Sequence, residues 1–209
     1  MTRIKICGIT RVQDALSAAH SGADALGLVF YAGSPRHVSL PQAAQLAVNI
    51  PPFVTRVGLF VNASADEVFR VMQAVPLDVL QFHGEEEPDY CAQFGRPYLK
   101  AIRVKAGVDL VQYAARFSAA QGLLLDAFVE GTHGGTGASF DWKLIPQELP
   151  LPIILSGGLH PGNVAEAIRQ VRPYAVDVSS GVEIGKGIKD AAKVAAFINE
   201  VNKIDVQLS

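Results

Sequence analysis

The stretch Arg3-Ile4-Lys5-Ile6-Cys7-Gly8, near the start of the 209-residue chain, has the alternating pattern of a β-strand that ends at a glycine. Side chains of a strand alternate between its two faces, so Ile4 and Ile6 share one face. Arg3, Lys5 and Cys7 share the other. This second face would meet solvent in a half-exposed sheet, but it would point inward in a closed barrel of parallel strands. The fold therefore decides whether the Cys7 thiol opens onto an active site.

Short runs rich in Leu, Val and Ile recur along the chain and alternate with segments of helical periodicity. The predicted strands are residues 3–7, 25–30, 56–62, 79–83, 98–103, 122–126, 153–156 and 175–179. The predicted helices are residues 12–21, 40–49, 65–74, 86–94, 108–117, 162–171 and 190–202, with a weaker helical segment at 142–145. Such alternation indicates parallel strands joined by right-handed crossovers.

Two folds share this alternation, and the residues after the first strand separate them. A doubly wound sheet normally has about five or six strands and a G-x-G-x-x-G turn after the first. Here the first strand is followed by Gly8-Ile9-Thr10-Arg11-Val12, which lacks that pattern. Eight strand–helix units instead predict an α/β protein: a parallel eight-stranded (β/α)8 TIM barrel in which residues 1–209 form a single compact domain.

The composition limits the partners that we expect. Hydrophobic residues make up 49% of the chain, yet no apolar run approaches the roughly 20 residues that cross a bilayer, so we expect no membrane association. The net charge is −2 without a basic stripe, so we expect no nucleic acid partner. With no signal-peptide pattern and only two cysteines, Cys7 and Cys91, we expect a cytoplasmic protein. Its expected oligomeric state is a monomer or a homodimer.

In such a barrel the outer strand faces pack on helices and should be apolar, so polar residues at alternate positions mark the interior. The period of two places the following residues inside: Lys5, Cys7, Gln81, His83, Arg103, Asp126 and Asp177. Lys5 and Asp177 lie on the first and last strands, which become neighbours on closure, and we expect them to form a buried ion pair. Several of the others end their strands, where barrel enzymes carry their chemistry.

Cys7 and Asp126 are the candidate catalytic residues. A free cysteine is often only a small buried hydrophobe, and an aspartate after a strand often caps a turn. Asp126, however, closes the run Leu123-Leu124-Leu125, and so apolar a setting favours the protonated carboxyl group that a general acid needs. The ends of the first and sixth strands face one another across the mouth, which suits a proton donor and a proton acceptor.

Two glycine-containing loops are candidates for phosphate binding. Gly157 and Gly158 follow the seventh strand, and Ser179-Ser180-Gly181 follows the eighth. Glycines let backbone N–H groups approach an anion, and barrels bind phosphate in these two loops. Each loop alone could be an ordinary turn, but the two together predict a phosphorylated small-molecule substrate.

Three further features concern the substrate. Arg36 follows Pro35 in the loop after the second strand, and a guanidinium held in this way suits a carboxylate. The glycine-rich segment 131–137 is either a lid or a surface turn. The five histidines lack metal-ligand spacing, so we expect no metal. His83 is expected to form hydrogen bonds in the pocket or core rather than act as a base.

With these residues in place, the chain resembles the phosphoribosylanthranilate isomerase family of tryptophan biosynthesis. The resemblance runs nearly end to end and rests on Lys5-Ile6-Cys7-Gly8-Ile9-Thr10, Ser34-Pro35-Arg36, Val57-Gly58-Leu59-Phe60-Val61-Asn62, Gln81-Phe82-His83-Gly84, Leu125-Asp126, Gly134-Gly135-Thr136-Gly137, Phe140-Asp141-Trp142, Ser156-Gly157-Gly158-Leu159 and Asp177-Val178-Ser179-Ser180-Gly181-Val182-Glu183.

The resemblance implies an Amadori rearrangement of a phosphorylated amino-sugar, N-(5-phosphoribosyl)anthranilate, without a cofactor. It places the general base on Cys7 and the general acid on Asp126. It also places the anthranilate carboxylate contact on Arg36, with Gly157, Gly158, Ser179, Ser180 and Gly181 at the phosphate and His83 in the pocket. Two alternatives remain. One is a sister aminoaldose isomerase of histidine biosynthesis, for which family resemblance implies carboxylates at both strand ends, where this chain has Cys7 at one of them. The other is a non-catalytic barrel that binds a phosphorylated ligand.

Overall fold

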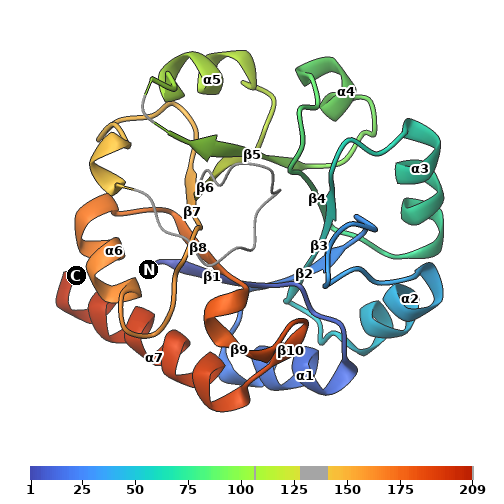
Figure 1. Ribbon diagram of the computed structural model, residues 1–209, viewed down its shortest axis with the longest axis horizontal. Helices are drawn as coiled ribbons and strands as arrows, with labels where there is room; N and C mark the ends of the chain where they lie inside the picture. Colours follow the sequence, from blue (N-terminus) through green and yellow to red (C-terminus); the bar gives the residue numbers. More distant parts are fainter. Residues whose placement is uncertain (106, 128–140, 209) are drawn as a thin grey trace.

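The first strand pairs with strands from both ends of the chain, and this pairing closes the sheet. In the computed structural model, which describes residues 1–105, 107–127 and 141–208, β1 (Arg3–Cys7) lies parallel to β2 (Ala25–Val29) and to β8 (Ala175–Val178). The strands between them are β3 (Thr55–Phe60), β4 (Val79–Phe82), β5 (Tyr98–Val104), β6 (Gly122–Ala127) and β7 (Ile153–Leu155). All eight form one closed parallel barrel in chain order (Figure 1). The predicted fold class and single domain are confirmed.

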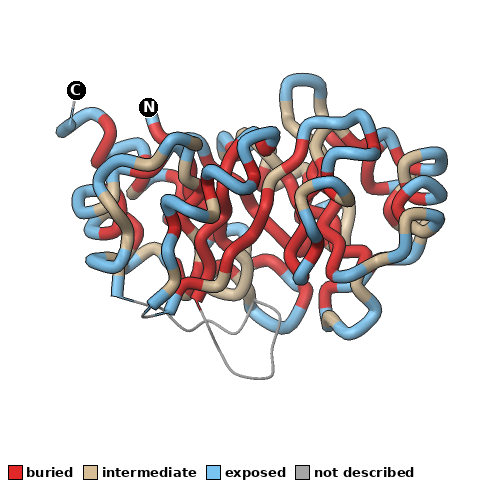
Figure 2. Tube along the Cα trace, turned by 90° about the horizontal axis from the view of Figure 1, so that it is seen from above, coloured by how far each residue is buried: buried red, intermediate tan, exposed pale blue. Residues whose placement is uncertain are grey.

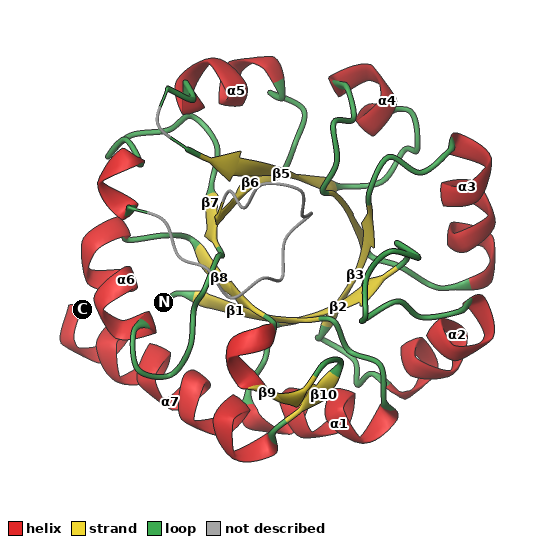
Figure 3. Ribbon diagram, viewed as in Figure 1, coloured by secondary structure: helices red, strands yellow, loops and turns green. Residues whose placement is uncertain are grey.

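A ring of helices surrounds the barrel (Figure 3). They are α1 (Val12–Ser21), α2 (Leu40–Asn49), α3 (Ala65–Ala74), α4 (Pro88–Ala92), α5 (Leu110–Arg116), α6 (Val164–Val171) and α7 (Ala191–Leu208). The weaker segment after β6 forms a short 3-10 helix, Trp142–Leu144. Buried positions follow the strands and the inner helix faces, whereas the outer helix faces are exposed (Figure 2). None of the helices described is long and apolar enough to cross a membrane.

Local sequence explains where several helices begin and end. Ser39 precedes α2 and its hydroxyl accepts a hydrogen bond from the backbone N–H of Gln42, as an N-cap residue does. Gly22 ends α1 with φ of 107°, a left-handed conformation that glycine adopts without strain. The prediction of a helix over 86–94 is too long, because α4 begins only at Pro88. Glu86 instead turns its buried carboxylate toward the backbone N–H of Gly84.

The loop after β8 holds a feature that the sequence pattern did not predict. After the short 3-10 helix Ser180–Val182, β9 (Glu183–Gly185) and β10 (Ile188–Lys189) form a two-stranded antiparallel sheet. Strands this short have no readable periodicity, so only the fold reveals them. They bring Glu183 and Lys189 to the mouth of the barrel.

Apolar packing occupies both sides of the sheet. The larger cluster fills the shell between the strands and the helices, and two smaller clusters lie inside the barrel, one of them around Leu124 and Ile154. One outward position departs from the expected apolar face. Lys100 of β5 is buried, and its ammonium donates to the Gly84 carbonyl and the Glu86 carboxylate. A charged residue is tolerated there because both partners satisfy it.

Candidate active site

Cys7 ends β1 inside the carboxyl-terminal mouth of the barrel and is 6% exposed. It packs in an interior cluster that includes Val29 and Leu59. Its parallel partner on β2 is Gly27, where an added Cβ would lie only 2.7 Å from the Cys7 Sγ. Gly27 therefore makes room for the thiol. Sequence reasoning missed this residue, although a glycine inside an apolar strand is the usual sign of such a close approach.

Charged side chains surround the thiol of Cys7. The Lys5 ammonium donates to the Asp177 carboxylate over 2.8 Å, and both side chains are nearly inaccessible, so the expected buried ion pair is confirmed. Burial raises the pKa of the Cys7 thiol, and the positive charges of Lys5 and Lys189 offset that rise only in part. The thiol form therefore dominates in the free site at neutral pH.

Asp126 lies near the end of β6 and is 4% exposed. Its Oδ1 accepts a hydrogen bond from the backbone N–H of Ala127 over 2.9 Å, and its Oδ2 lies 3.2 Å from Nε2 of His83. Gly157, from the loop after β7, packs directly against this corner, where an added Cβ would lie 2.7 Å from the Ala127 nitrogen. The backbone of β6 and the His83 ring after β4 thus hold the carboxyl group in one orientation.

Gln81 determines how His83 meets this carboxyl group. The Gln81 Nε2 atom lies 3.0 Å from His83 Nδ1, and an amide nitrogen can only donate. With the amide in this orientation, Nδ1 accepts and the ring proton lies on Nε2, where it points at Asp126, while the buried Oε1 of Gln81 has no partner among the described residues. Both ring nitrogens of His83 are occupied by protein groups, so its predicted substrate contact stays a prediction.

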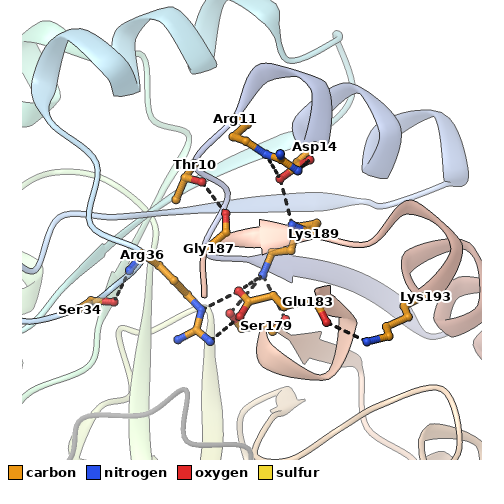
Figure 4. A network of polar contacts seen from close by, with 10 residues as sticks. All are labelled: Thr10, Arg11, Asp14, Ser34, Arg36, Ser179, Glu183, Gly187, Lys189 and Lys193. Carbon is orange, nitrogen blue, oxygen red and sulfur yellow. Dashed lines mark hydrogen bonds and ion pairs between the residues drawn. The ribbon is translucent and has the colours of Figure 1, made fainter. Parts of the chain in front are cut away.

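Arg36 is fixed rather than solvated. It is 7% exposed, and its Nε and Nη2 donate to the two carboxylate oxygens of Glu183 over 2.7 and 2.8 Å (Figure 4). The Lys189 ammonium shares one of these oxygens and also donates to the Ser179 backbone carbonyl. Burial alone would raise the pKa of Glu183, but the hydrogen bonds from Arg36 and Lys189 outweigh it and lower that pKa. The carboxylate therefore stays ionised.

The two candidate phosphate loops lie against one another. Gly157 and Gly158 both adopt left-handed conformations, with φ of 85° and 64°. An added Cβ on Gly181 would lie 1.9 Å from the Leu159 carbonyl oxygen, so only glycine fits this contact. Ser179 and Ser180 are partly exposed at the same end of the barrel. The glycines therefore allow the two loops to approach one another, and their contact with a phosphate stays a prediction.

The structure thus brings most of the predicted residues to one mouth. Arg103 pairs in register with Asp126 and donates to Glu85 at the rim. Cys91 is fully buried on α4, as expected for a packing residue. Segment 131–137 lies outside the described residues. Within the part of the chain that the structure describes, no three His, Cys, Asp or Glu side chains form a group that could hold a metal ion.

Sequence reasoning assigned no role to Glu183 or Lys189. Both lie in the small β9–β10 sheet, far along the chain from Arg36, and nothing in the local pattern indicates that they meet it. A closed β/α barrel whose mouth gathers a buried thiol, a buried carboxyl group and glycine loops has the arrangement of a (β/α)8-barrel enzyme.

Comparison with known proteins narrows this class to one family. A model of the N-(5′-phosphoribosyl)anthranilate (PRA) isomerase family matches residues 4–200. An N-(5′-phosphoribosyl)anthranilate isomerase of Thiobacillus denitrificans is 63% identical over 198 residues, covering 95% of this chain and 97% of the relative. One from Pseudomonas aeruginosa is 61% identical, with 95% and 94% covered. The chain belongs to the N-(5′-phosphoribosyl)anthranilate isomerase family and is an isomerase.

Solved structures agree with this assignment. Phosphoribosyl anthranilate isomerase from Thermotoga maritima superposes with a TM-score of 0.90 at 41% identity, covering 97% of this chain and all of that one. A complex of phosphoribosyl anthranilate isomerase with reduced 1-(o-carboxyphenylamino)-1-deoxyribulose 5-phosphate superposes with a TM-score of 0.83 at 39% identity, with 97% and 100% covered. The likeness therefore includes a relative solved with a phosphorylated ligand.

Proposed function

We propose that this chain catalyses the Amadori rearrangement of N-(5-phosphoribosyl)anthranilate to 1-(2-carboxyphenylamino)-1-deoxyribulose 5-phosphate, a step of tryptophan biosynthesis. The observation that carries the proposal is the pairing of Cys7 and Asp126, one buried thiol and one buried carboxyl group on inward strand faces at the same mouth. Family membership supplies the substrate. The surrounding charges supply the anchors for its two anionic ends.

In this mechanism Asp126 is the general acid and Cys7 the general base. Asp126 gives its proton to the furanose ring oxygen, and the C1′–O bond breaks to leave an imine. The Cys7 thiolate then takes the proton from C2′, and the resulting enolamine tautomerises to the ketone by protonation at C1′. Only protons and bonding electrons move, so the atoms balance without an oxidant. His83 donates to the carboxylate that forms when Asp126 releases its proton.

The anchors follow from charge and backbone geometry. Arg36 takes the anthranilate carboxylate. The loops at Gly157-Gly158 and Ser179-Ser180-Gly181 take the phosphate through backbone N–H groups, while His83 lines the pocket between these ends. Burial raises the pKa of Cys7, so most enzyme molecules that bind substrate carry Cys7 as a neutral thiol. Only the fraction with a Cys7 thiolate can take the C2′ proton.

A fluorescence assay of anthranilate-ribosyl turnover tests this proposal. Cys7→Ala and Asp126→Asn should each lower kcat on the order of 10²–10⁴-fold, with binding of the reduced product analogue largely kept. Near-normal kcat in either variant would remove that residue from the mechanism. Turnover of the aminoaldose of histidine biosynthesis alone would instead support the sister isomerase, and ligand binding without turnover of either substrate would support a non-catalytic barrel.

The remaining expectations are a cytoplasmic location, no membrane or nucleic acid partner, and a monomeric or homodimeric state. One related crystal structure shows monomers generated from the dimeric phosphoribosylanthranilate isomerase of Thermotoga maritima. In this chain Phe53 is fully exposed in the turn before β3, with a left-handed φ of 69°. Light scattering of the wild type gives its mass and so distinguishes a monomer from a homodimer. If the wild type is a dimer that buries the Phe53 ring, Phe53→Asp should dissociate it.

A further inference from the structure

Three charged side chains from separate parts of the chain form one buried cluster at the mouth. Arg36 comes from the loop after β2, Glu183 begins β9, and Lys189 ends β10. Their side chains are only 9%, 6% and 2% exposed. Figure 4 shows Glu183 between the guanidinium on one side and the ammonium on the other.

The contact between Arg36 and Glu183 fixes the plane of the guanidinium. Nε donates to one carboxylate oxygen over 2.7 Å and Nη2 to the other over 2.8 Å, which is a bidentate pair. Two parallel hydrogen bonds prevent rotation of the planar group. They leave Nη1 as the edge that Glu183 does not occupy, and this edge lies in the same fixed plane.

Lys189 fixes the Glu183 carboxylate, which in turn fixes the Arg36 guanidinium. Its ammonium lies 2.9 Å from Oε1 of Glu183, the oxygen that also accepts from Arg36 Nε. The same ammonium donates to the backbone carbonyl and the hydroxyl of Ser179 over 3.1 and 3.3 Å. The cluster therefore joins the loop that carries Arg36 to the loop that carries Ser179.

The charges of this cluster favour an orienting role over a stabilising one. Two basic side chains surround one carboxylate, and burial lowers the pKa of Lys189, so the charge that the cluster presents at the mouth is that of the Arg36 guanidinium. A buried ion pair seldom stabilises a fold more than apolar side chains of similar size would. Its value lies instead in presenting a cation in one orientation, at a place where an anionic ligand is expected.

We propose that Glu183 is a positioning residue: it aligns Arg36 for the carboxylate of the substrate, and Lys189 ties this alignment to the phosphate loop at Ser179. The proposal rests on the proposed function, because it takes the anthranilate carboxylate as the ligand of Arg36. Glu183 itself does not touch substrate. It acts through the guanidinium, so its removal should weaken recognition of one chemical group only.

The test measures binding of two ligands to Glu183→Gln. One is the reduced product analogue, 1-(2-carboxyphenylamino)-1-deoxyribitol 5-phosphate, and the other is the same molecule without its carboxyl group. Glutamine keeps the shape but can accept only one of the two hydrogen bonds from Arg36. We expect the carboxylated ligand to bind roughly 10- to 100-fold more weakly and the ligand without a carboxyl group to bind as it does to the wild type.

Lys193→Met is the matched control, since the Lys193 ammonium donates to the backbone carbonyl of Glu183 and leaves the carboxylate untouched. It should bind both ligands normally. Arg36→Met should reproduce the selective loss, and Glu183→Gln added to Arg36→Met should cause no further loss. If Glu183→Gln does not fold, Glu183→Asp, which keeps the charge but shortens the reach, is measured in the same way.

The outcomes separate this proposal from the proposed function. Equal weakening of both ligands, or no weakening of either, would overturn the positioning role. Loss confined to the carboxylated ligand, with a raised KM and a nearly unchanged kcat, would support it. A wild-type protein that binds both ligands but turns over no substrate would refute the proposed reaction while leaving the binding comparison intact.

Discussion

Replacing Lys5 with methionine should lower the free energy of unfolding by the amount expected when a buried ion pair loses one partner. Lys5 and Asp177 join β1 to β8 where the sheet closes, over 2.8 Å, with side chains only 4% and 6% exposed. Lys5→Met leaves the Asp177 carboxylate buried without its partner, which costs about 3–5 kcal/mol. In a chain of this size each kcal/mol lowers Tm by roughly 2–4 °C, so Tm should fall by roughly 6–20 °C.

A surface pair on the same strand provides the control. Arg3 contacts Asp24 over the same 2.8 Å, but these side chains are 57% and 32% exposed. Arg3→Met should therefore cost less than about 1 kcal/mol. The double variant Lys5→Met with Asp177→Leu removes both buried charges and should recover most of the lost Tm.

Calorimetry or circular dichroism across pH completes the test. The attraction of Asp177 and Cys7 outweighs burial and raises the pKa of Lys5. Its stabilising contribution is thus fully present below the pKa of an unfolded lysine and disappears only as pH rises through the higher folded value. The Tm difference between wild type and Lys5→Met should therefore still be present at pH 9. Equal Tm values for Lys5→Met and Arg3→Met, or no recovery in the double variant, would refute the reasoning.

Three further predictions concern the site. Because burial raises the pKa of Cys7, its thiolate fraction, followed as the rate of alkylation by iodoacetamide that is lost in Cys7→Ala, should climb about tenfold per pH unit through pH 8 and level off only above the ordinary thiol value of about 8.5; a plateau below pH 8 would contradict this. Gly181→Ala should force the two candidate phosphate loops apart and raise KM about tenfold or more in steady-state assays, whereas Gly185→Ala, with open space around its Cβ, should not. Gln81→Leu removes the donor to His83 and should lower kcat roughly 2- to 10-fold at constant KM; an unchanged kcat would show that the tautomer does not matter.

The barrel was predictable because its pattern is local. Alternation in residues 3–7 and apolar runs such as 122–126 fix strands without knowledge of their neighbours, and the period of two correctly turned Lys5, Gln81, His83 and Asp177 inward. Errors occurred where a tertiary contact overrides the local signal. Helix α4 is shortened by the buried carboxylate of Glu86, and Lys100 occupies an outward face because Glu86 meets it there.

The sequence by itself determined the fold class, the mouth at which the candidate residues gather, and, through family motifs, the reaction to test. Only the tertiary structure decided the state of those residues. Burial makes Cys7 a mostly protonated thiol, and two short strands near residues 183–189 bring Glu183 and Lys189 to Arg36. The physical reason is that strand patterning depends on neighbours along the chain, whereas proton affinity and the orientation of a guanidinium depend on neighbours in space.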